Sequence, residues 1–471
     1  MIMKKRMSIV TLIVCALIFT SSFVISALAE NSEAQEGTVS GDFEYSVCPD
    51  TVAEEYRGTL EIIRYLGTDS DVVIPAEIDG KKVTVIGDNL FYKNENLKSV
   101  KLPDTIISIG TEAFSLCESL ETINIPSGVK EIGGAFRGCE KLTSIAIPEG
   151  VEYIYFDTFK DCSSLKNVQL PNGLKILYDF AFENCSSLSE ISIPDSVEEL
   201  GTGVFAGCTS LENIVIPESV LYIGNGLFTD SAVYKDAENW SDGVLYINNC
   251  LLDSKREEIS GEISILDGTR VVAKNAFLGA ENLASLKLPA SVKSICDFAF
   301  ADCSSLKTVE FSNGIETIGD SAFKSCGMEN IIIPEGVKTI GENAFQKGKL
   351  KSVTLPKSLE AIGDGAFEGN SIYTIRYNGT ETEWNEKQLG KSLTVAPYTT
   401  MFFGEDESGS DVSNESNDAS QNDLESSDAE NDDKDNRNTI TIIIVALFVV
   451  VAVVVLVVCL KKKKLKESSN C

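Results

Sequence analysis

Residues 181–201 read AFENCSSLSEISIPDSVEELG, and similar segments stand 23 residues away on either side. Residues 158–178 read TFKDCSSLKNVQLPNGLKILY, and residues 204–224 read VFAGCTSLENIVIPESVLYIG. A fixed internal period of about 20 to 50 residues is typical of repeat architectures, in which each repeat is one structural unit. The fold of this 471-residue chain therefore depends on how such units combine.

The repeat follows the pattern F-x-x-C-x-x-L-x-x-I-x-I-P-x-x-V-x-x-I-G-x-x-A-F. Its Phe recurs at steps of 22 or 23 residues, apart from one step of 49 that corresponds to two periods plus a short insert. Ten of the twelve prolines share one slot, which indicates that a strand ends there, because proline cannot donate to a β-ladder. The Phe positions are Phe91, Phe114, Phe136, Phe159, Phe182, Phe205, Phe228, Phe277, Phe300, Phe323, Phe345 and Phe367.

Apolar and polar residues alternate within one unit. Leu188, Ile191 and Ile193 would face one side, with Glu190 and Ser192 on the other, and this period of two predicts a short strand. The few apolar side chains of one unit bury too little area to offset the conformational entropy lost on ordering it. Stacked units bury one another's faces, so the sequence predicts a repeat solenoid.

The repeat and its flanks resemble the BspA-type leucine-rich repeats of bacterial and protist surface proteins over about residues 43–400. The resemblance is carried by LSEISIPDSVEELG at 188–201, by DVVIPAEIDGKKVTVIG at 71–87 and by IRYNGTETEWNEKQLG at 375–390. It implies a leucine-rich repeat solenoid that is β-rich with short 3-10 or helical turns. It also implies adhesion, with an extracellular protein or glycoprotein, such as a host matrix protein or another cell surface, as the partner.

Both ends of the chain have the composition of targeting segments. Residues 1–29 combine a basic start, an apolar run and a small-x-small site before Glu30, which predicts a secretory signal peptide. Residues 439–460 contain a charge-free run long enough to cross a bilayer, and KKKKLK follows, which predicts one transmembrane helix and a cytoplasmic tail at 461–471. The expected location is the cell membrane, with a single pass and the N-terminal region outside.

Between these ends we expect four segments. Residues 30–85 would form an N-terminal cap, and residues 86–372 the solenoid, with an atypical insert at 229–266 that lacks the Pro and Cys slots. Residues 373–403 would form a C-terminal cap. Residues 404–438 hold thirteen acidic and two basic residues with almost nothing apolar, which predicts a disordered acidic stalk.

The charge and residue content exclude several classes of function. The chain has 40 Lys and Arg, 71 Asp and Glu, a net charge of −31 and no His. Its negative field repels nucleic acid, and the missing His removes the commonest metal ligand and general base. Glycine-containing stretches at 201–207 and 318–323 lack the spacing of a dinucleotide loop or a nucleophile elbow. We expect no catalytic residue, no cofactor, no metal ligand and no nucleic-acid partner.

Seven cysteines share one slot of the repeat, and we predict a structural column of buried thiols before each strand. Disulfides remain an alternative, although stacked neighbours at ~4.8 Å are wider than the usual ~3.5–4.5 Å between bonded Cβ atoms. A nucleophilic role is a second alternative, which has no His base to support it. Cys48, Cys250 and Cys296 fit no slot and stay undecided. The column comprises Cys117, Cys139, Cys162, Cys185, Cys208, Cys303 and Cys326.

Aromatic residues interrupt the polar pattern in the middle of the chain. Some take an outward slot that other units fill with Ser, Thr or Glu, some take the glycine slot, and some lie on the insert. Aromatic side chains are favoured at binding sites, although these could instead pack against each other and under the insert. The other outward strand positions are small, polar and free of rings. The candidate partner-binding residues are Tyr153, Tyr155, Ile176, Tyr178, Tyr222, Tyr234 and Trp240.

These features predict a membrane-anchored cell-surface leucine-rich repeat protein that mediates adhesion or protein–protein binding without catalysis. The alternative is a structural, envelope-organising surface protein that self-associates. A surface hydrolase is a third hypothesis, for which the sequence offers no residue.

Overall fold

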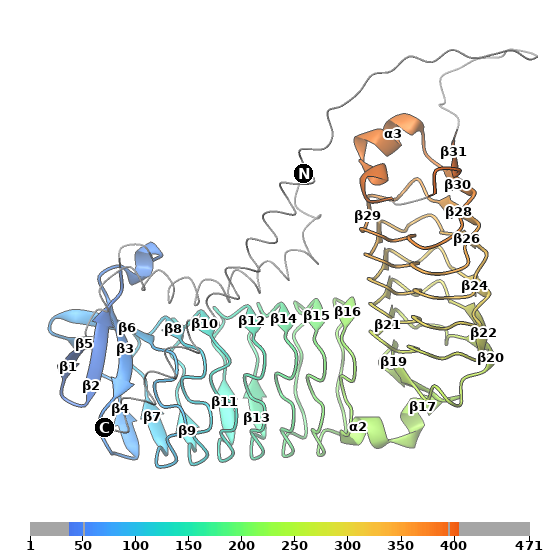
Figure 1. Cartoon of the computed structure of the whole chain (residues 1–471). Helices are drawn as coiled ribbons and strands as arrows, with labels where there is room; N and C mark the ends of the chain where they lie inside the picture. The colour runs from blue at the N-terminus through green and yellow to red at the C-terminus, as the bar shows by residue number, and fades with distance from the viewer. Residues whose placement is uncertain (1–36, 50–51, 394–395, 405–471) are drawn as a thin grey trace, which may run out of the picture. The chain divides into compact units, whose positions relative to one another are not determined.

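The computed structural model describes residues 37–49, 52–393 and 396–404 (Figure 1). These residues confirm the predicted solenoid: successive turns of the chain, here called coils, stack through parallel pairs of short strands. Within the described ranges, no helix has the length and apolar character that a membrane crossing requires. The expected signal peptide at 1–29, transmembrane helix at 439–460 and tail at 461–471 lie outside the described residues, as does the stalk at 404–438 except Gly404.

Most coils contribute two strands, and the strands form two columns along the solenoid. The first column contains the I-x-I stretch of the repeat. Its strands are β4 (Asp71–Val73), β7 (Ser99–Lys101), β9 (Thr122–Ile123), β11 (Ser144–Ala146), β13 (Asn167–Gln169), β20 (Gly261–Ser264), β22 (Leu283–Lys287), β24 (Thr308–Glu310), β26 (Asn330–Ile332), β28 (Ser352–Leu355), β30 (Thr374–Tyr377) and β31 (Thr400–Phe403).

The second column contains the x-I stretch before the glycine slot. Its strands are β3 (Leu60–Tyr65), β6 (Lys81–Ile86), β8 (Ser108–Ile109), β10 (Glu131–Ile132), β12 (Tyr153–Ile154), β14 (Ile176–Leu177), β15 (Glu199–Leu200), β16 (Tyr222–Ile223), β19 (Cys250–Ser254), β21 (Val271–Val272), β23 (Ser294–Ile295), β25 (Thr317–Ile318), β27 (Thr339–Ile340) and β29 (Ala361–Ile362). Most of these strands have only two residues. Such short strands are stable here because each one pairs with strands of the neighbouring coils.

The strand predicted at Ile191–Ile193 is absent, which corrects the sequence-based expectation. Leu188, Ile191 and Ile193 are buried as their spacing predicted. However, residues 191–193 join no regular ladder, and the strand of this coil is β15. The alternation of apolar residues therefore predicted correctly which side chains are buried. It could not predict whether the backbone forms a strand, because that depends on pairing with neighbouring coils.

Phenylalanine fills the core at one level of the twelve coils that carry the repeat Phe. The rings from Phe91 to Phe228 stack with centroids 5.2 to 5.8 Å apart and planes within 15° of each other. A second stack runs from Phe277 to Phe367 at 5.1 to 5.4 Å. The interruption between Phe228 and Phe277 coincides with the insert, and the two hydrophobic clusters of the core both extend into the insert.

The residues two before and two after each Phe have left-handed backbone conformations in all twelve coils. Their φ values lie between 54° and 76°. In the coil of Phe114, the N–H groups of Glu112, Phe114 and Leu116 donate to three carbonyls of the next coil. The alternating conformation therefore directs backbone donors along the stack. The expected 3-10 turns do not occur in the repeats that the structure describes: the 3-10 helices found there lie near the two ends of the described chain and in the insert.

The two ends of the described chain differ. At the start, β1 (Thr38–Ser40), β2 (Phe43–Val47) and β3 form an antiparallel sheet that continues into the solenoid through β6, which β5 (Glu77–Ile78) also pairs. The 3-10 helix η1 (Glu54–Tyr56) connects β2 and β3. At the other end, α3 (Glu381–Glu386) and the 3-10 helix η3 (Leu389–Ser392) follow β30, and η3 contacts β29.

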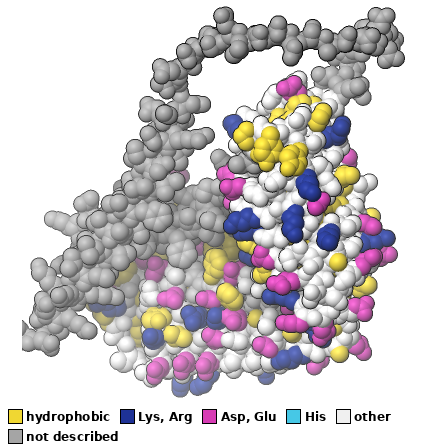
Figure 2. Space-filling view, turned by 45° about the vertical axis from the view of Figure 1, so that its right-hand side comes forward, with side chains coloured by type: hydrophobic (Ala, Val, Ile, Leu, Met, Phe, Trp, Pro, Cys, Tyr) yellow, Lys and Arg dark blue, Asp and Glu magenta, His cyan; other side chains and the backbone are white. Residues whose placement is uncertain are grey.

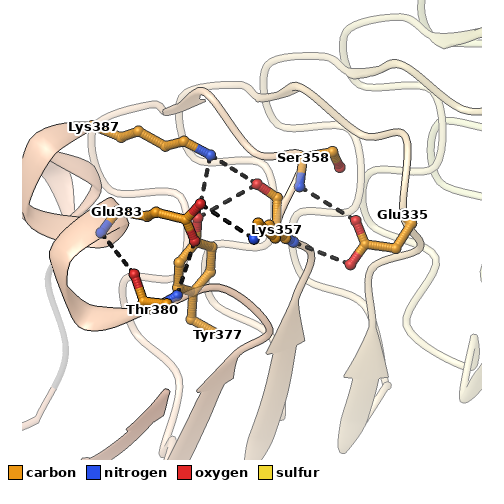
Figure 3. A network of polar contacts seen from close by, with 7 residues as sticks. All are labelled: Glu335, Lys357, Ser358, Tyr377, Thr380, Glu383 and Lys387. Atoms are coloured by element: carbon orange, nitrogen blue, oxygen red, sulfur yellow. Dashed lines mark hydrogen bonds and ion pairs between the residues drawn. The ribbon is translucent and has the colours of Figure 1, made fainter. Parts of the chain in front are cut away.

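A polar network attaches α3 to the last coils (Figure 3). Thr380 and Glu383 form a capping box, in which each side chain accepts the backbone N–H of the other residue. Lys357 lies 3.3 Å from the Glu383 carboxylate, and Lys387 donates to the Lys357 carbonyl at 2.8 Å. The pKa of Glu383 lies below its usual value because its carboxylate accepts the Thr380 N–H and lies near lysines.

The insert is an irregular segment whose buried side chains belong to both hydrophobic clusters. It contains α2 (Ala232–Lys235), the 3-10 helix η2 (Ala237–Asn239), and β17 (Trp240–Ser241) and β18 (Val244–Ile247), which pair antiparallel and continue to β19. β19 then pairs in parallel with β21, and regular stacking resumes. The antiparallel hairpin accounts for the missing Pro and Cys slots.

One buried arginine joins the coils on either side of the insert. The Arg270 guanidinium donates to the carbonyls of Pro217 at 2.6 Å and Ile216 at 3.2 Å, and also to those of Glu218 and Val220. Nearby, the Lys274 N–H donates to the Ile223 carbonyl at 2.9 Å. These bonds connect the last coil before the insert directly to the coil after it.

Candidate partner-binding face

Part of the predicted aromatic set forms one group of rings on the second strand column. Tyr155 and Tyr178 lie parallel, with planes 2° apart and centroids 5.8 Å apart. Tyr153 is 6.3 Å from Tyr155 and 6.4 Å from Tyr178, and Phe156 is 5.0 Å from Tyr178. We call Tyr153, Tyr155, Phe156 and Tyr178 the tyrosine face.

The position of these rings follows from the repeat. Tyr153 is the first residue of β12, while Tyr155 and Tyr178 occupy the glycine slot after β12 and β14. Tyr178 is buried, whereas Phe156 is 38% exposed. The next two coils return to glycine at Gly201 and Gly224, so the rings end abruptly on that side. Phe156 was missed from the sequence, although it follows the altered glycine slot directly.

Strand register extends the face toward the insert. Tyr153, Ile176, Glu199 and Tyr222 occupy one row across β12, β14, β15 and β16. Ile176 therefore separates Tyr153 from Glu199, and Tyr222 lies on the far side of Glu199. The Tyr222 hydroxyl donates to Asp297 at 2.9 Å, so this residue bonds to a coil beyond the insert.

Carboxylates surround this row. Burial raises the pKa of Glu199 to about 7, and the charges of Asp179 and Asp297 add to the effect. Burial also raises the pKa of Tyr153, with Glu152 and Glu198 contributing. Burial is the larger cause of both pKa shifts, and the neighbouring carboxylates add negative charge around the row.

Tyr234 and Trp240 belong to a separate group in the insert. Their rings meet edge to face at 5.3 Å, and Trp240 Nε1 donates to the Tyr234 carbonyl at 2.8 Å. The Tyr234 hydroxyl donates to Asp253 at 3.2 Å, and Lys255 lies over the Trp240 ring. Among the described residues, no ring contact joins this pair to the tyrosine face, and its contacts stabilise the insert itself.

The seven cysteines of the repeat slot are buried and free, and so are Cys48, Cys250 and Cys296. Each of the seven thiols donates to the carbonyl of the Phe in the preceding coil at 3.0 to 3.2 Å. Burial raises the pKa of Cys162 to about 12 and that of the other six as well. Across residues 37–49, 52–393 and 396–404, no group of three or more Cys, Asp or Glu is arranged to hold a metal ion.

Sequence reasoning also missed an exposed group of rings at the end of the first column. Tyr373 and Tyr398 are 55% and 57% exposed, with ring centroids 5.4 Å apart. Phe402 of β31 is 43% exposed, and Arg376 lies over its ring. Figure 2 shows hydrophobic side chains gathered near this end of the described chain. Tyr398 and Phe402 follow α3, outside the repeat pattern, so their outward position could not be read from it.

The stacked coils with their phenylalanine and cysteine columns define a leucine-rich repeat solenoid. The sequence profile of the family described as "BspA type Leucine rich repeat region (6 copies)" matches residues 84–134, 133–253 and 270–394. The chain therefore belongs to the BspA-type leucine-rich repeat family, as its sequence resemblance indicated. No curated protein matches the chain.

Several crystal structures are similar to this chain. A leucine rich cell surface protein from Faecalibacterium prausnitzii A2-165 is 28% identical, over 75% of this chain and 98% of that one, with a TM-score of 0.34. A leucine-rich repeat protein from Bacteroides ovatus ATCC 8483 is 24% identical, over 78% and 100%, with a TM-score of 0.38. The pneumococcal vaccine antigen PcpA is 20% identical, over 79% and 99%, with a TM-score of 0.33. The family assignment rests on the repeat match rather than on these superpositions.

Proposed function

We propose that this chain is a non-catalytic cell-surface protein that binds an extracellular protein or glycoprotein through the tyrosine face. The observation that carries the proposal is the contact among four aromatic rings at one place on a repeat where most equivalent positions in other coils are small or polar. Rings in contact are already ordered, so a partner gains contact area at little cost in side-chain entropy.

We also propose that the protein is located in the cell membrane. The signal at 1–29 would export the chain, and the span at 439–460 would retain it in the membrane with the solenoid outside. A leucine rich cell surface protein among the similar structures supports this expectation. Adhesion to host matrix or to another cell is the role that this arrangement would serve.

The test measures binding of the full chain, solubilised in detergent, to a panel of purified extracellular matrix proteins by surface plasmon resonance. We expect saturable binding to one of them, weakened at least tenfold by Tyr153→Ala with Tyr155→Ala while the melting temperature changes little. Tyr92→Ala is the control, because it removes an exposed ring elsewhere on the surface. Equal affinity for the wild type and the Tyr153/Tyr155 variant would refute the proposed face.

Self-association is a second candidate function, favoured by the exposed rings near β31. Within the described residues, β31 pairs only with β30, so its other edge is open. Open edges and exposed rings favour pairing with another chain. Sedimentation equilibrium should then show oligomers that Tyr398→Ser with Phe402→Ser converts to monomers; a monomeric wild type would exclude this candidate.

A further inference from the structure

The charges around the tyrosine face indicate the chemistry of its partner. Glu199 lies in the row between Ile176 and Tyr222, and Asp179 and Asp297 both raise its pKa. The positive charge of Lys274 lowers the pKa of Glu199, but this is the smallest of the four contributions to the shift. Glu152 and Glu198 add negative charge beside Tyr153.

Most of these carboxylates already have a hydrogen-bond or ion-pair partner within the chain. Asp179 accepts the Thr202 N–H at 2.7 Å, and Asp297 accepts both the Asp320 N–H at 2.9 Å and the Tyr222 hydroxyl. Glu198 has Lys175 at 3.9 Å. Glu199, by contrast, has no hydrogen bond or ion pair with any described residue. Its side chain is half-buried, so it is a carboxylate of this row that is left unpaired within the described structure.

The rings favour the same kind of ligand. An ammonium or guanidinium group is attracted to the face of an aromatic ring, and the attraction strengthens where water is excluded. A guanidinium can also form two parallel hydrogen bonds with one carboxylate. Three successive coils carry Tyr155, Tyr178 and Glu199. The coil of Tyr155 and the coil of Glu199 are therefore about two strand spacings apart.

We propose that the tyrosine face, together with Glu199, receives a lysine or arginine side chain from an extended segment of the partner protein. This inference rests on the proposed function and specifies its partner class. The net charge of −31 adds to the specificity, because it attracts basic segments over long range and repels acidic ones.

The experiment uses the solubilised full chain and a fluorescein-labelled peptide, Gly-Ser-Arg-Ser-Arg-Ser-Gly, with binding followed by fluorescence anisotropy at low salt. The comparison peptide carries citrulline, which keeps the shape of arginine without its charge. We expect saturable binding of the arginine peptide, at least tenfold weaker binding of the citrulline peptide, and a roughly fivefold loss with Glu199→Gln. Glu212→Gln, an exposed carboxylate elsewhere, is the matched control and should change nothing.

The pH dependence separates a direct role of Glu199 from a structural one. Because a bound cation favours the ionised carboxylate, affinity should rise between pH 5.5 and 8 in the wild type and stay flat in Glu199→Gln. Equal losses with Glu199→Gln and Glu212→Gln, or no loss with Glu199→Gln, would overturn the inference. A different result is a matrix protein that binds the Glu199→Gln chain normally but the Tyr153/Tyr155 variant weakly. That result would support the proposed function and refute only the inference that the partner contributes a basic side chain.

Discussion

At the scale of single residues, the repeated cysteine acts as a donor inside the stack. The Cys162 thiol donates to the Phe136 carbonyl at 3.2 Å, and that carbonyl also accepts the Cys139 N–H. Burial removes the water that would solvate the thiolate, so it raises the pKa of Cys162 to about 12. The thiol is therefore a neutral, structural group at pH 7.

This shift makes the stability of the solenoid depend on alkaline pH. An unfolded cysteine ionises near pH 9, whereas folded Cys162 stays neutral to about pH 12. The contribution of the neutral thiol is thus fully present below pH 9 and is lost as pH rises from 9 toward 12, at ~1.4 kcal/mol per pH unit. Cys162→Ala should reduce the slope of unfolding free energy against pH by about that amount, measured by denaturant unfolding at pH 9.5 and 10.5.

The control for this prediction is Val204→Ala, which removes buried volume without removing a thiol. It should lower the free energy of unfolding at every pH and leave the slope unchanged. Identical slopes for wild type and Cys162→Ala would mean that the thiol already ionises in the folded chain.

At the scale of one coil, two left-handed residues around each Phe turn the chain and direct its donors along the stack. Glycine fills only some of these positions. Leu116, Phe180 and Phe298 adopt φ values of 60°, 61° and 54°, conformations that cost an ordinary side chain roughly 1–2 kcal/mol. The sequence repeat therefore concealed this turn, because no single residue type marks it.

Gly279 offers a test of this turn, since its φ is 74° and an added Cβ would meet no atom within 4 Å. Gly279→Ala should then lower the free energy of unfolding by about 1 kcal/mol through backbone strain alone, measured by denaturant unfolding. Gly128→Ala is the control: its added Cβ makes ordinary contacts, and no left-handed φ is involved. Equal effects of the two substitutions would show that backbone handedness is not the cause.

The same coil shows how far the sequence could predict structure. The period of 22 or 23 residues identified the stack, and apolar alternation identified the buried side chains. Two-residue strands such as β15 could not be predicted, because neighbouring coils form them. At the candidate site, Tyr153, Tyr155 and Tyr178 could be predicted because they replace the polar residue or glycine that most other repeats have at the same position. The bond from Tyr222 to Asp297 spans 75 residues, so no local pattern could reveal it.

At the scale of the whole described chain, the insert separates two stacks of phenylalanine, and Arg270 bridges the interruption. A buried guanidinium that donates to four carbonyls satisfies acceptors that the regular stacking leaves open beside the hairpin. In a solenoid, each unit is stabilised mainly by its immediate neighbours, so one weakened contact can separate the unfolding of the two sides. We therefore expect cooperative unfolding across the insert to depend on Arg270 in addition to the Tyr222–Asp297 and Lys274–Ile223 hydrogen bonds.

Arg270→Met tests this dependence, because it keeps the apolar stem of the side chain and removes all donors. Leaving several buried carbonyls unpaired should lower stability by roughly 3 kcal/mol or more. Calorimetry should show one principal transition of the solenoid in the wild type and two in the variant, one for the coils of Phe91 to Phe228 and one for those of Phe277 to Phe367. Arg256→Met, an exposed change within the insert, should preserve the single transition. If Arg270→Met still melted in one step and lost no more stability than Arg256→Met, the hairpin strands rather than the arginine would couple the two sides.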